Sequence, residues 1–147
     1  GIHDIALASR SLIGNDTKSL VTKLNNIARQ AVYLSTVVGT GPFDKQLFES
    51  TGREFKIGPD YIYYYNLLYE MGIMANISFI LERHHNQWSS QEEALDGQRR
   101  MFREMTAEEE GKVRSYLRQH LVQVEDGWQL PYPRQCYWAV MWWTKDK

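Results

Sequence analysis

The sequence has little cysteine, no excess of either charge and no long uninterrupted hydrophobic run. Its 147 residues include one cysteine, Cys136, so no disulfide bond can form within the chain. Lys plus Arg number 17 and Asp plus Glu number 18, which excludes the broad positive field typical of proteins that bind nucleic acids or acidic membranes. A chain of this length buries roughly two thirds of its unfolded surface, so an ordinary hydrophobic core suffices without metals or disulfides.

The most apolar long window, residues 61–81, does not have the composition of a membrane helix. It contains Glu70, Asn66, Asn76 and several tyrosines, and a membrane-spanning helix tolerates few such groups. We therefore predict no membrane span and leave peripheral membrane contact open. The chain begins at Gly1 without an initiator methionine, which fits a processed mature chain or a residue left by an added tag. Nothing in the sequence indicates a cellular location.

Motifs that carry catalytic or cofactor chemistry are also missing. Glu82 and His85 have the Glu-x-x-His spacing that places two metal ligands on one helix face, but the sequence holds no second such pair. Cys136 has no signature of a catalytic thiol around it, and no Gly-x-Ser-x-Gly motif occurs. The Gly-rich run 39–42 ends in proline and lacks the lysine of a phosphate-binding loop, so it is expected to end a helix. We predict no catalytic residues, no cofactor and no metal.

Hydrophobic spacing predicts helices over most of the chain. The clearest is a helix that begins at Asp16 or Thr17, whose apolar residues step by three and four: Leu20, Leu24, Ile27, Ala31, Leu34 and Val38. A weaker helical pattern covers 2–13, a short helix covers 43–50, and a long one begins at Asp60 and runs to about His85. Two more helices begin at Ser90 and Thr106, each with a glutamate three residues on, as in a capping box.

Gly72 lies near the middle of the long segment that begins at Asp60. Glycine inside a helix costs about 1 kcal/mol relative to alanine, so this residue indicates a kink, a break or a tight helix crossing. Close packing of a neighbouring helix against Gly72 and Ala75 is the preferred explanation. The tyrosines of the same segment lie all around the predicted helix, which favours a central position in the core.

The last twenty residues hold four of the five tryptophans. Before them, residues 122–130 alternate in polarity around Asp126-Gly127, which indicates either a short β-hairpin or a plain loop. Pro131 and Pro133 favour an extended chain, and 137–143 is either a strand or a helical turn. Large aromatic side chains dominate cores and interfaces, so segment 128–143 is expected to dock on the rest of the chain or on a partner.

These patterns together predict a mainly α fold. We expect one domain over 1–147, an irregular bundle of five or six helices with an extended aromatic C-terminal segment. The predicted function is a non-catalytic protein–protein interaction module, or accessory subunit of a larger assembly, that binds a protein partner through exposed aromatic residues. The candidate interaction residues are Trp128, Trp138, Trp142, Trp143, Tyr63, Arg99, Arg100 and Arg103.

Two alternatives remain open at this point. The first is a helical nucleic-acid-binding module that uses the basic residues between Arg99 and Arg118, although the balanced net charge disfavours it. The second is a small helical enzyme or ligand-binding protein with a tyrosine-lined pocket near Gly72. In that pocket Glu70, His84 or His85 would supply acid–base chemistry, which requires Glu70 to be buried.

Overall fold

A computed structural model of the chain describes residues 1–12 and 16–145, and it divides the chain into two compact units. Unit 1 comprises Gly1–Gly41, Ile57–Glu82 and Cys136–Lys147, and unit 2 comprises Pro42–Lys56 and Arg83–Gln135. Unit 2 thus consists of two insertions into the sequence of unit 1. The single domain over 1–147 stays a prediction, because two compact units of one chain can still unfold together.

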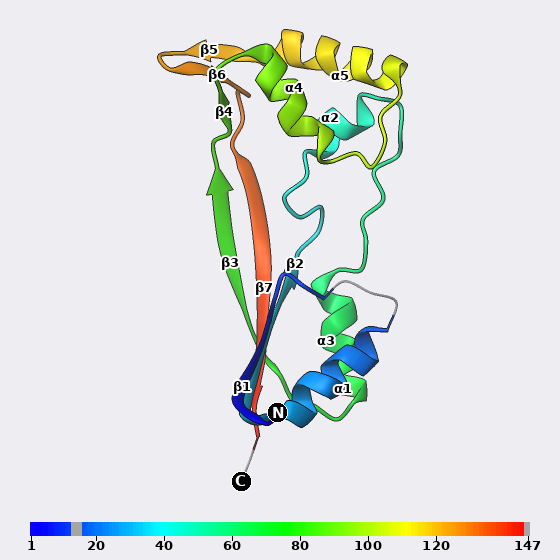
Figure 1. Cartoon of the computed structure of the whole chain (residues 1–147), viewed down its shortest axis with the longest axis vertical. Helices are drawn as coiled ribbons and strands as arrows, with labels where there is room; N and C mark the ends of the chain where they lie inside the picture. Colours follow the sequence, from blue (N-terminus) through cyan, green and yellow to red (C-terminus); the bar gives the residue numbers. More distant parts are fainter. Residues whose placement is uncertain (13–15, 146–147) are drawn as a thin grey trace. The chain divides into compact units, whose positions relative to one another are not determined.

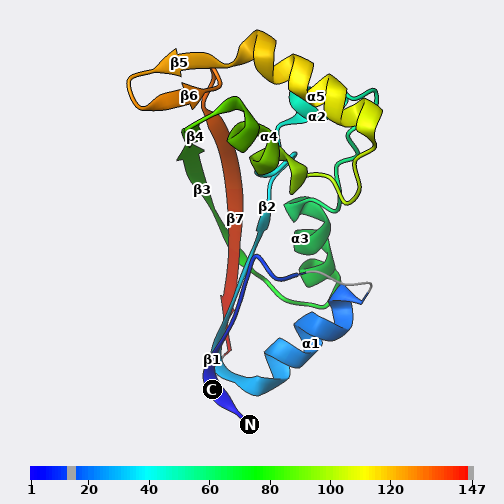
Figure 2. The same cartoon turned by 45° about the horizontal axis from the view of Figure 1, so that its top comes forward.

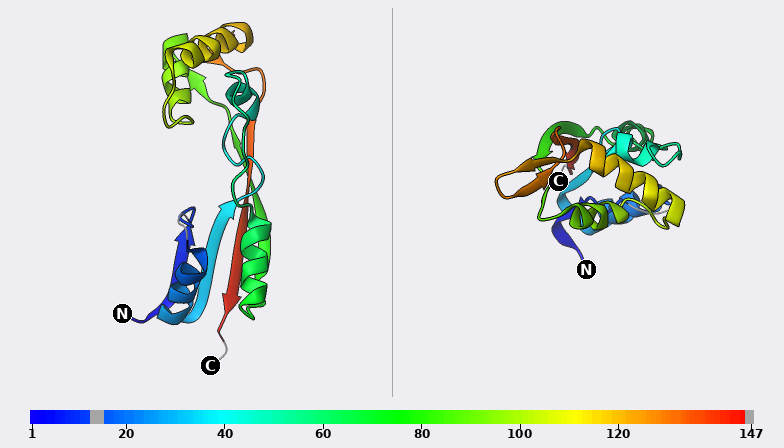
Figure 3. Two further views of the ribbon diagram at one scale, coloured as in Figure 1. Left: turned by 90° about the vertical axis from the view of Figure 1, so that its right-hand side faces the viewer. Right: turned by 90° about the horizontal axis from the view of Figure 1, so that it is seen from above.

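Unit 1 is built on a four-stranded sheet in the order β1-β2-β7-β3. Its strands are β1 (His3–Ser9), β2 (Ala28–Val37), β3 (Asn76–His84) and β7 (Arg134–Thr144). Strand β1 runs parallel to β2, and β7 runs antiparallel to β2. Helix α1 (Thr17–Ile27) connects the two parallel strands, and helix α3 (Tyr61–Glu70) precedes β3. Both helices lie on the same face of the sheet (Figure 1; Figure 3, left).

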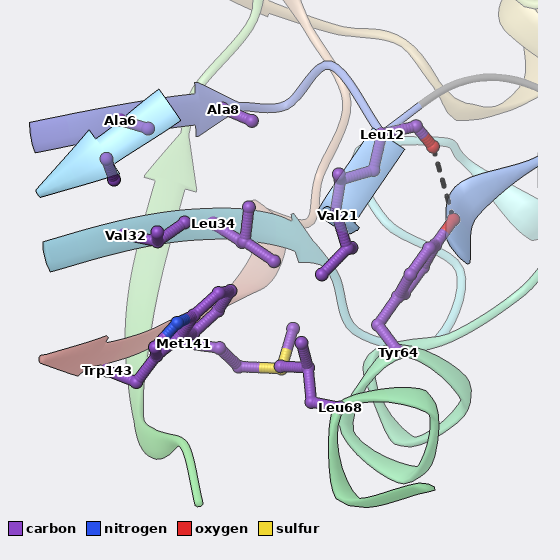
Figure 4. Close-up of a cluster of buried hydrophobic side chains, with 11 residues drawn as sticks. Ala6, Ala8, Leu12, Val21, Val32, Leu34, Tyr64, Leu68, Met141 and Trp143 are labelled. Carbon is purple, nitrogen blue, oxygen red and sulfur yellow. Dashed lines mark hydrogen bonds between the residues drawn. The ribbon is translucent and has the colours of Figure 1, made fainter. Parts of the chain in front are cut away.

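The core of unit 1 lies between this sheet and its two helices. Alternate residues of the strands point to the helices, and Figure 4 shows them converging on Val21 of α1 and on Tyr64 and Leu68 of α3. The strand residues of this cluster are Ala6, Ala8, Val32, Leu34, Met141 and Trp143. The hydroxyl of Tyr64 donates a hydrogen bond to the carbonyl oxygen of Leu12, so the one polar atom of this ring is paired.

Unit 2 combines three helices with a small three-stranded sheet (Figure 2). The helices are α2 (Lys45–Glu49), α4 (Gln91–Arg99) and α5 (Ala107–His120), and the strands are β4 (Gln87–Trp88), β5 (Val122–Val124) and β6 (Gly127–Gln129). Its own hydrophobic core includes Leu47, Leu95, Val113 and Leu117, all of which are almost fully buried. Each unit therefore has a separate core.

The prediction of a mainly helical bundle is wrong, because long strands replace several expected helices. The helix predicted from Asp16 to Val38 ends at Ile27, and 28–37 is strand β2. Its sequence Ala31-Val-Tyr-Leu-Ser-Thr-Val is rich in β-branched and aromatic residues, which favour a strand. Val32 and Leu34 alternate toward the core with period two, and the steps of three and four that suggested a helix run through the same residues by coincidence.

Three further expectations fail for related reasons. Residues 3–9 form β1 rather than a helix, and Ile13, the expected helix end, lies outside the described residues. The long helix from Asp60 ends at Glu70, and 76–84 form β3. Gly72 ends that helix in a left-handed conformation with φ 76°, and an added Cβ would meet nothing within 4 Å, so close packing is not its role.

Local signals were more reliable than the long patterns. Asp16, Asp60, Ser90 and Thr106 are all N-caps whose side chains accept a backbone hydrogen bond, and Thr106 forms a reciprocal capping box with Glu109. The hairpin considered for 122–130 is present as β5 and β6. Among the described residues, no helix is both long and apolar enough to cross a membrane.

Glu109 provides a pH-dependent contribution to the stability of unit 2. The carboxylate of Glu109 accepts a hydrogen bond from the Arg53 guanidinium, with 2.7 Å between Nη2 and Oε2, and another from the backbone N–H of Thr106. These hydrogen bonds lower the pKa of Glu109 from 4.5 to about 2. Because the pKa is depressed in the folded state, the contribution is complete above pH 4.5 and is lost as the pH falls toward 2. At neutral pH we expect the wild-type protein to unfold at a higher urea concentration than the Glu109→Gln variant. This difference in urea midpoint should shrink as the pH is lowered.

The control for this experiment is built into the substitution. Glutamine keeps an oxygen that can accept from the Thr106 N–H, so the helix cap survives and only the ionisable group is removed. A difference between the two proteins that stays constant from neutral to strongly acidic pH would contradict the assignment to Glu109.

Candidate functional site

Arg10, directly after β1, has the most unusual backbone of unit 1. Its φ is 55°, and it is the only non-glycine residue with positive φ in the part of the chain that the structure describes. The backbone N–H of Arg10 donates to Oγ of Ser35 at 3.0 Å and to the carbonyl oxygen of Ser35 at 3.2 Å. A left-handed conformation costs free energy in a residue that carries a β-carbon, and the two hydrogen bonds to Ser35 help to hold Arg10 in it.

The side chain of Arg10 lies over the indole of Trp138. The guanidinium carbon is 4.0 Å from the ring centroid, and Nη2 is 3.2 Å from Oε2 of Glu82. The indole Nε1 of Trp138 donates to the same carboxylate oxygen at 2.6 Å. Arginine, tryptophan and glutamate from three different parts of unit 1 are thereby joined in one polar cluster.

This cluster lies at the carboxyl edge of the two parallel strands. Arg10 follows the last residue of β1, and Trp138 pairs with Val37, the last residue of β2. In open α/β sheets, ligands bind outside the carboxyl ends of the parallel strands. The cluster of Arg10, Trp138 and Glu82 is therefore placed where such a sheet holds its ligand, and we call it the edge cluster.

A pocket of about 230 Å³ opens beside the edge cluster, on the face of the sheet that the helices leave uncovered. Its walls are mostly apolar, and the hydroxyls of Ser9 and Ser35, 3.2 Å apart, add polar groups. Residues from all four strands, or directly after β1, line it: Leu7, Ser9, Arg10, Tyr33, Leu34, Ser35, Ile80, Trp138 and Val140. An apolar cavity with a few convergent polar groups is the usual form of a small-molecule site, and this volume suits a single ring system.

The loop after β2 adds backbone groups at the same edge. Gly39 has φ 62°, a conformation that favours glycine, and its N–H donates to Oδ2 of Asp60 at 3.2 Å. Asp60 also caps the start of α3. The expected helix terminator at 39–42 is therefore a loop that follows a strand, and it is tied to the helix that follows.

Unit 2 contains its own polar network, a chain of hydrogen bonds through the buried Asp44 and the half-buried Tyr132 and Tyr116. The Tyr132 hydroxyl donates to Oδ2 of Asp44 at 2.8 Å and lies 2.8 Å from the Tyr116 hydroxyl. Burial, followed by the bonds to Tyr116 and Asp44, raises the pKa of Tyr132 far above its ordinary value. Burial also raises the pKa of Tyr116. Both phenols stay protonated at neutral pH, so neither tyrosine supplies a base, and their hydrogen bonds link α5, Asp44 and the segment at Tyr132.

The candidate tryptophans lie mainly within the chain's own packing. Trp143 is buried in the core of unit 1, and Trp138 is buried beside Arg10 and Glu82. Trp142 is half-buried in β7, and the half-buried Trp128 pairs across strands with Trp88 in unit 2. Segment 137–143 is part of strand β7, which settles whether it is a strand or a helical turn.

The remaining candidate residues lie on the surface. Tyr63 is exposed on α3, and Arg100 and Arg103 are exposed after α4. Arg99, the last residue of α4, forms ion pairs with Asp96 and with Glu110, the latter at 3.1 Å. Whether any of these side chains contacts another molecule stays a prediction.

The interaction-module prediction is wrong, because it required a surplus of aromatic side chains at the chain end. The structure instead uses the C-terminal aromatic segment as an inner strand of the sheet, between β2 and β3. The alternative pocket near Gly72 also fails, since Glu70, His84 and His85 are all exposed. The helical basis of the nucleic-acid alternative is weakened as well, because Arg99 and Arg114 pair with carboxylates of α4 and α5.

The spacing of Glu82 and His85 does not indicate a metal-ligand pair, because 76–84 is a strand and not a helix. Residues three apart share a face of a helix but not of a strand, so these two side chains do not form a ligand pair. Over residues 1–12 and 16–145, no group of three or more His, Cys, Asp or Glu side chains is arranged to hold a metal ion.

Sequence reasoning missed Arg10 and Glu82, the charged residues of the edge cluster. Residues 2–13 were interpreted as a helix, which hid the fact that Ser9-Arg10-Ser11 follows a strand. Alternation of Ala6 and Ala8 toward the core was the available signal. It was weak, because Ile5 and Leu7 on the other face are also apolar.

Unit 1 is an open, two-layer α/β sheet with a pocket at its carboxyl edge. No protein-family description matches the sequence. An uncharacterized protein of Haemophilus influenzae is 32% identical over 146 residues, which are 98% of this chain and 53% of the relative. The chain therefore spans about half the length of this curated relative.

Solved structures with similarity to this chain include one that matches over almost its whole length. It is the crystal structure of a putative methyltransferase from Bacillus halodurans, with 13% identity and a TM-score of 0.49. The match covers 99% of this chain and 65% of the other. A score at this level does not establish a common fold, and the two units described above stand on their own geometry.

Proposed function

We propose that unit 1 binds a small organic anion with a single ring at the carboxyl edge of its sheet, as part of a protein longer than this chain. The observation that carries the proposal is the edge cluster beside its pocket of about 230 Å³. Its position agrees with the general rule for ligands of open α/β sheets. The match to about half of the relative supports the longer protein.

The groups at the site suit an anion with a flat apolar body. Arg10 has five N–H donors in a planar fork, and the bond to Glu82 leaves donors that can hold a carboxylate in two parallel hydrogen bonds. The aromatic ring of the ligand would contact Tyr33, Ile80 and Val140 on the pocket wall. Arg10 and Glu82 are binding groups in this proposal, and no chemical step is assigned to them.

The test uses benzoate as the probe, followed by NMR of the ¹⁵N-labelled chain. Benzoate is small enough for the pocket, and we expect a dissociation constant on the order of 1 mM, typical of fragment-sized ligands. Shifts should concentrate on residues of the pocket and on the Trp138 indole N–H. Replacing Arg10 with alanine should weaken binding about tenfold or more, because a charge-assisted hydrogen bond contributes about 1.5–3 kcal/mol.

Arg29→Ala is the matched control. Arg29 is also in unit 1 and also pairs with a carboxylate, Asp4 at 2.8 Å, but it does not line the pocket. This variant should bind benzoate as the wild type does. Equal weakening in both variants would show that only net charge attracts the probe, and unchanged binding in Arg10→Ala would remove the site.

A further inference from the structure

The face of the unit 1 sheet away from α1 and α3 is apolar and uncovered. Side chains alternate along a strand, so the residues between the core residues of β1, β2 and β7 point to this second face. We call it the open face, and its residues are Ile5, Leu7, Tyr33, Ile80, Val140 and Trp142. Leu7 is 69% exposed, and Ile5 and Ile80 are each 55% exposed. No described segment of unit 1 packs over these three side chains.

Such a face is unusual for a sheet with parallel strands. Sheets of this kind occur almost only with helices on both faces, because their strands are apolar on both sides. Strand β1 fits that description, since it carries Ala6 and Ala8 toward the core and Ile5 and Leu7 toward the open face. Strand β1 is also an edge strand with one neighbour, β2, so its outer edge can accept a further strand.

The direction in which successive strands are added to the sheet indicates what kind of element would cover the open face. From β1 the chain moves to β2 and later to β3, in one direction across the sheet, with its helices on one face. Right-handed crossovers place helices on the opposite face when strands are added in the opposite direction, beyond β1. The relative has about as much polypeptide outside the match as inside it, enough for such a layer.

We propose that the open face is covered by a layer of helices belonging to the same protein, in polypeptide that corresponds to the unmatched part of the Haemophilus influenzae relative. The same segment supplies a strand that pairs with the free edge of β1. The covering layer buries Leu7 and Ile80 and closes the pocket beside Arg10 on its open side. The segment that covers the open face thus belongs to the same folded domain as the sheet, and it is not a separate protein partner.

The test compares cysteine reactivity in this chain alone and in a chimera that joins it to the unmatched part of the relative. Leu7→Cys and Ile80→Cys report on the open face. Met74→Cys is the control, because Met74 is 92% exposed in the loop between α3 and β3, next to the helix-covered side. In the chimera we expect the two open-face cysteines to react with a maleimide at least about tenfold more slowly than in the chain alone, with Met74→Cys unchanged.

Each other outcome overturns the proposal. Equal reactivity of Leu7→Cys and Ile80→Cys in the chain and in the chimera would mean that the added segment does not cover the face. Equal slowing at Met74→Cys in a chimera that is monomeric by light scattering would mean that protection is not confined to the open face, which contradicts a layer on that face. If the chain alone is a dimer by light scattering and already protects both cysteines, a second copy is the occupant. Two reporter positions are used because one of the two cysteine variants can fail to fold.

Discussion

Replacing Trp143 with alanine is expected to lower the free energy of unfolding by about 3–5 kcal/mol, a large share of the roughly 5–15 kcal/mol that holds a typical domain folded. Trp143 is 5% exposed and packs in the core between the sheet and the helices of unit 1 (Figure 4). Its indole Nε1 donates to Oδ1 of Asn25 at 2.9 Å, so the substitution also removes the partner of that amide. Urea unfolding followed by far-UV circular dichroism measures the change.

Trp142→Ala is the matched control for this experiment. Trp142 is the preceding residue of the same strand, but it points to the open face and is half-buried. Its hydrogen bond with Asn76 uses the backbone carbonyl, which alanine keeps. We expect a cost of about 1 kcal/mol. Equal losses for the two variants would contradict the placement of Trp143 in the core and Trp142 on the open face.

Replacing Asp44 with alanine should destabilise unit 2 by about 2–4 kcal/mol, because it removes two roles of one buried carboxylate. Oδ1 accepts from the backbone N–H of Leu47 at 3.0 Å and caps α2, and Oδ2 accepts from the Tyr132 hydroxyl at 2.8 Å. Without that acceptor the Tyr132 hydroxyl keeps Tyr116 as its remaining partner. Chemical denaturation monitored by the NMR signals of the Trp88 and Trp128 indole N–H groups, both in unit 2, follows the transition.

Asp44→Asn separates the two roles. Asparagine caps a helix as well as aspartate does, and its amide can donate to the Tyr132 oxygen while Tyr132 donates to Tyr116. This variant should retain most of the stability that Asp44→Ala loses. If asparagine were as damaging as alanine, the negative charge itself would be the stabilising feature, and the hydrogen-bond account of this network would be wrong.

The helix caps of this chain could be predicted from sequence because each depends on neighbours within four residues. Thr106 and Glu109 satisfy each other's backbone groups whatever lies around them, and the Asp16 carboxylate accepts from the backbone N–H of Ser19, three residues on. A break at Gly72 was one of three alternatives considered, and it is the one that the local left-handed conformation of this residue matches. The packing reason given for it was wrong because packing depends on elements distant in sequence.

Strand β2 shows why the fold class could not be predicted in the same way. Its residues have an apolar pattern compatible with a helix and with a strand, and pairing decided between them. Strand β1 pairs with one edge of β2. Strand β7, which lies more than 100 positions later in the sequence, pairs with the other edge. Those ladder bonds satisfy the backbone groups that a helix would have satisfied internally.

The balanced charge, the single cysteine and the capped helix starts could all be predicted from the residues alone, because composition and short-range hydrogen bonding depend on no distant contact. The hairpin at 122–130 was one of two alternatives that the residues left open. Tertiary structure alone decided the sheet, the burial of Trp143 and the meeting of Arg10 with Glu82 and Trp138. Those three residues are separated by long stretches of chain. They come together only because β1, β3 and β7 belong to one sheet, and the order of strands in a sheet is set by long-range pairing that no local pattern records.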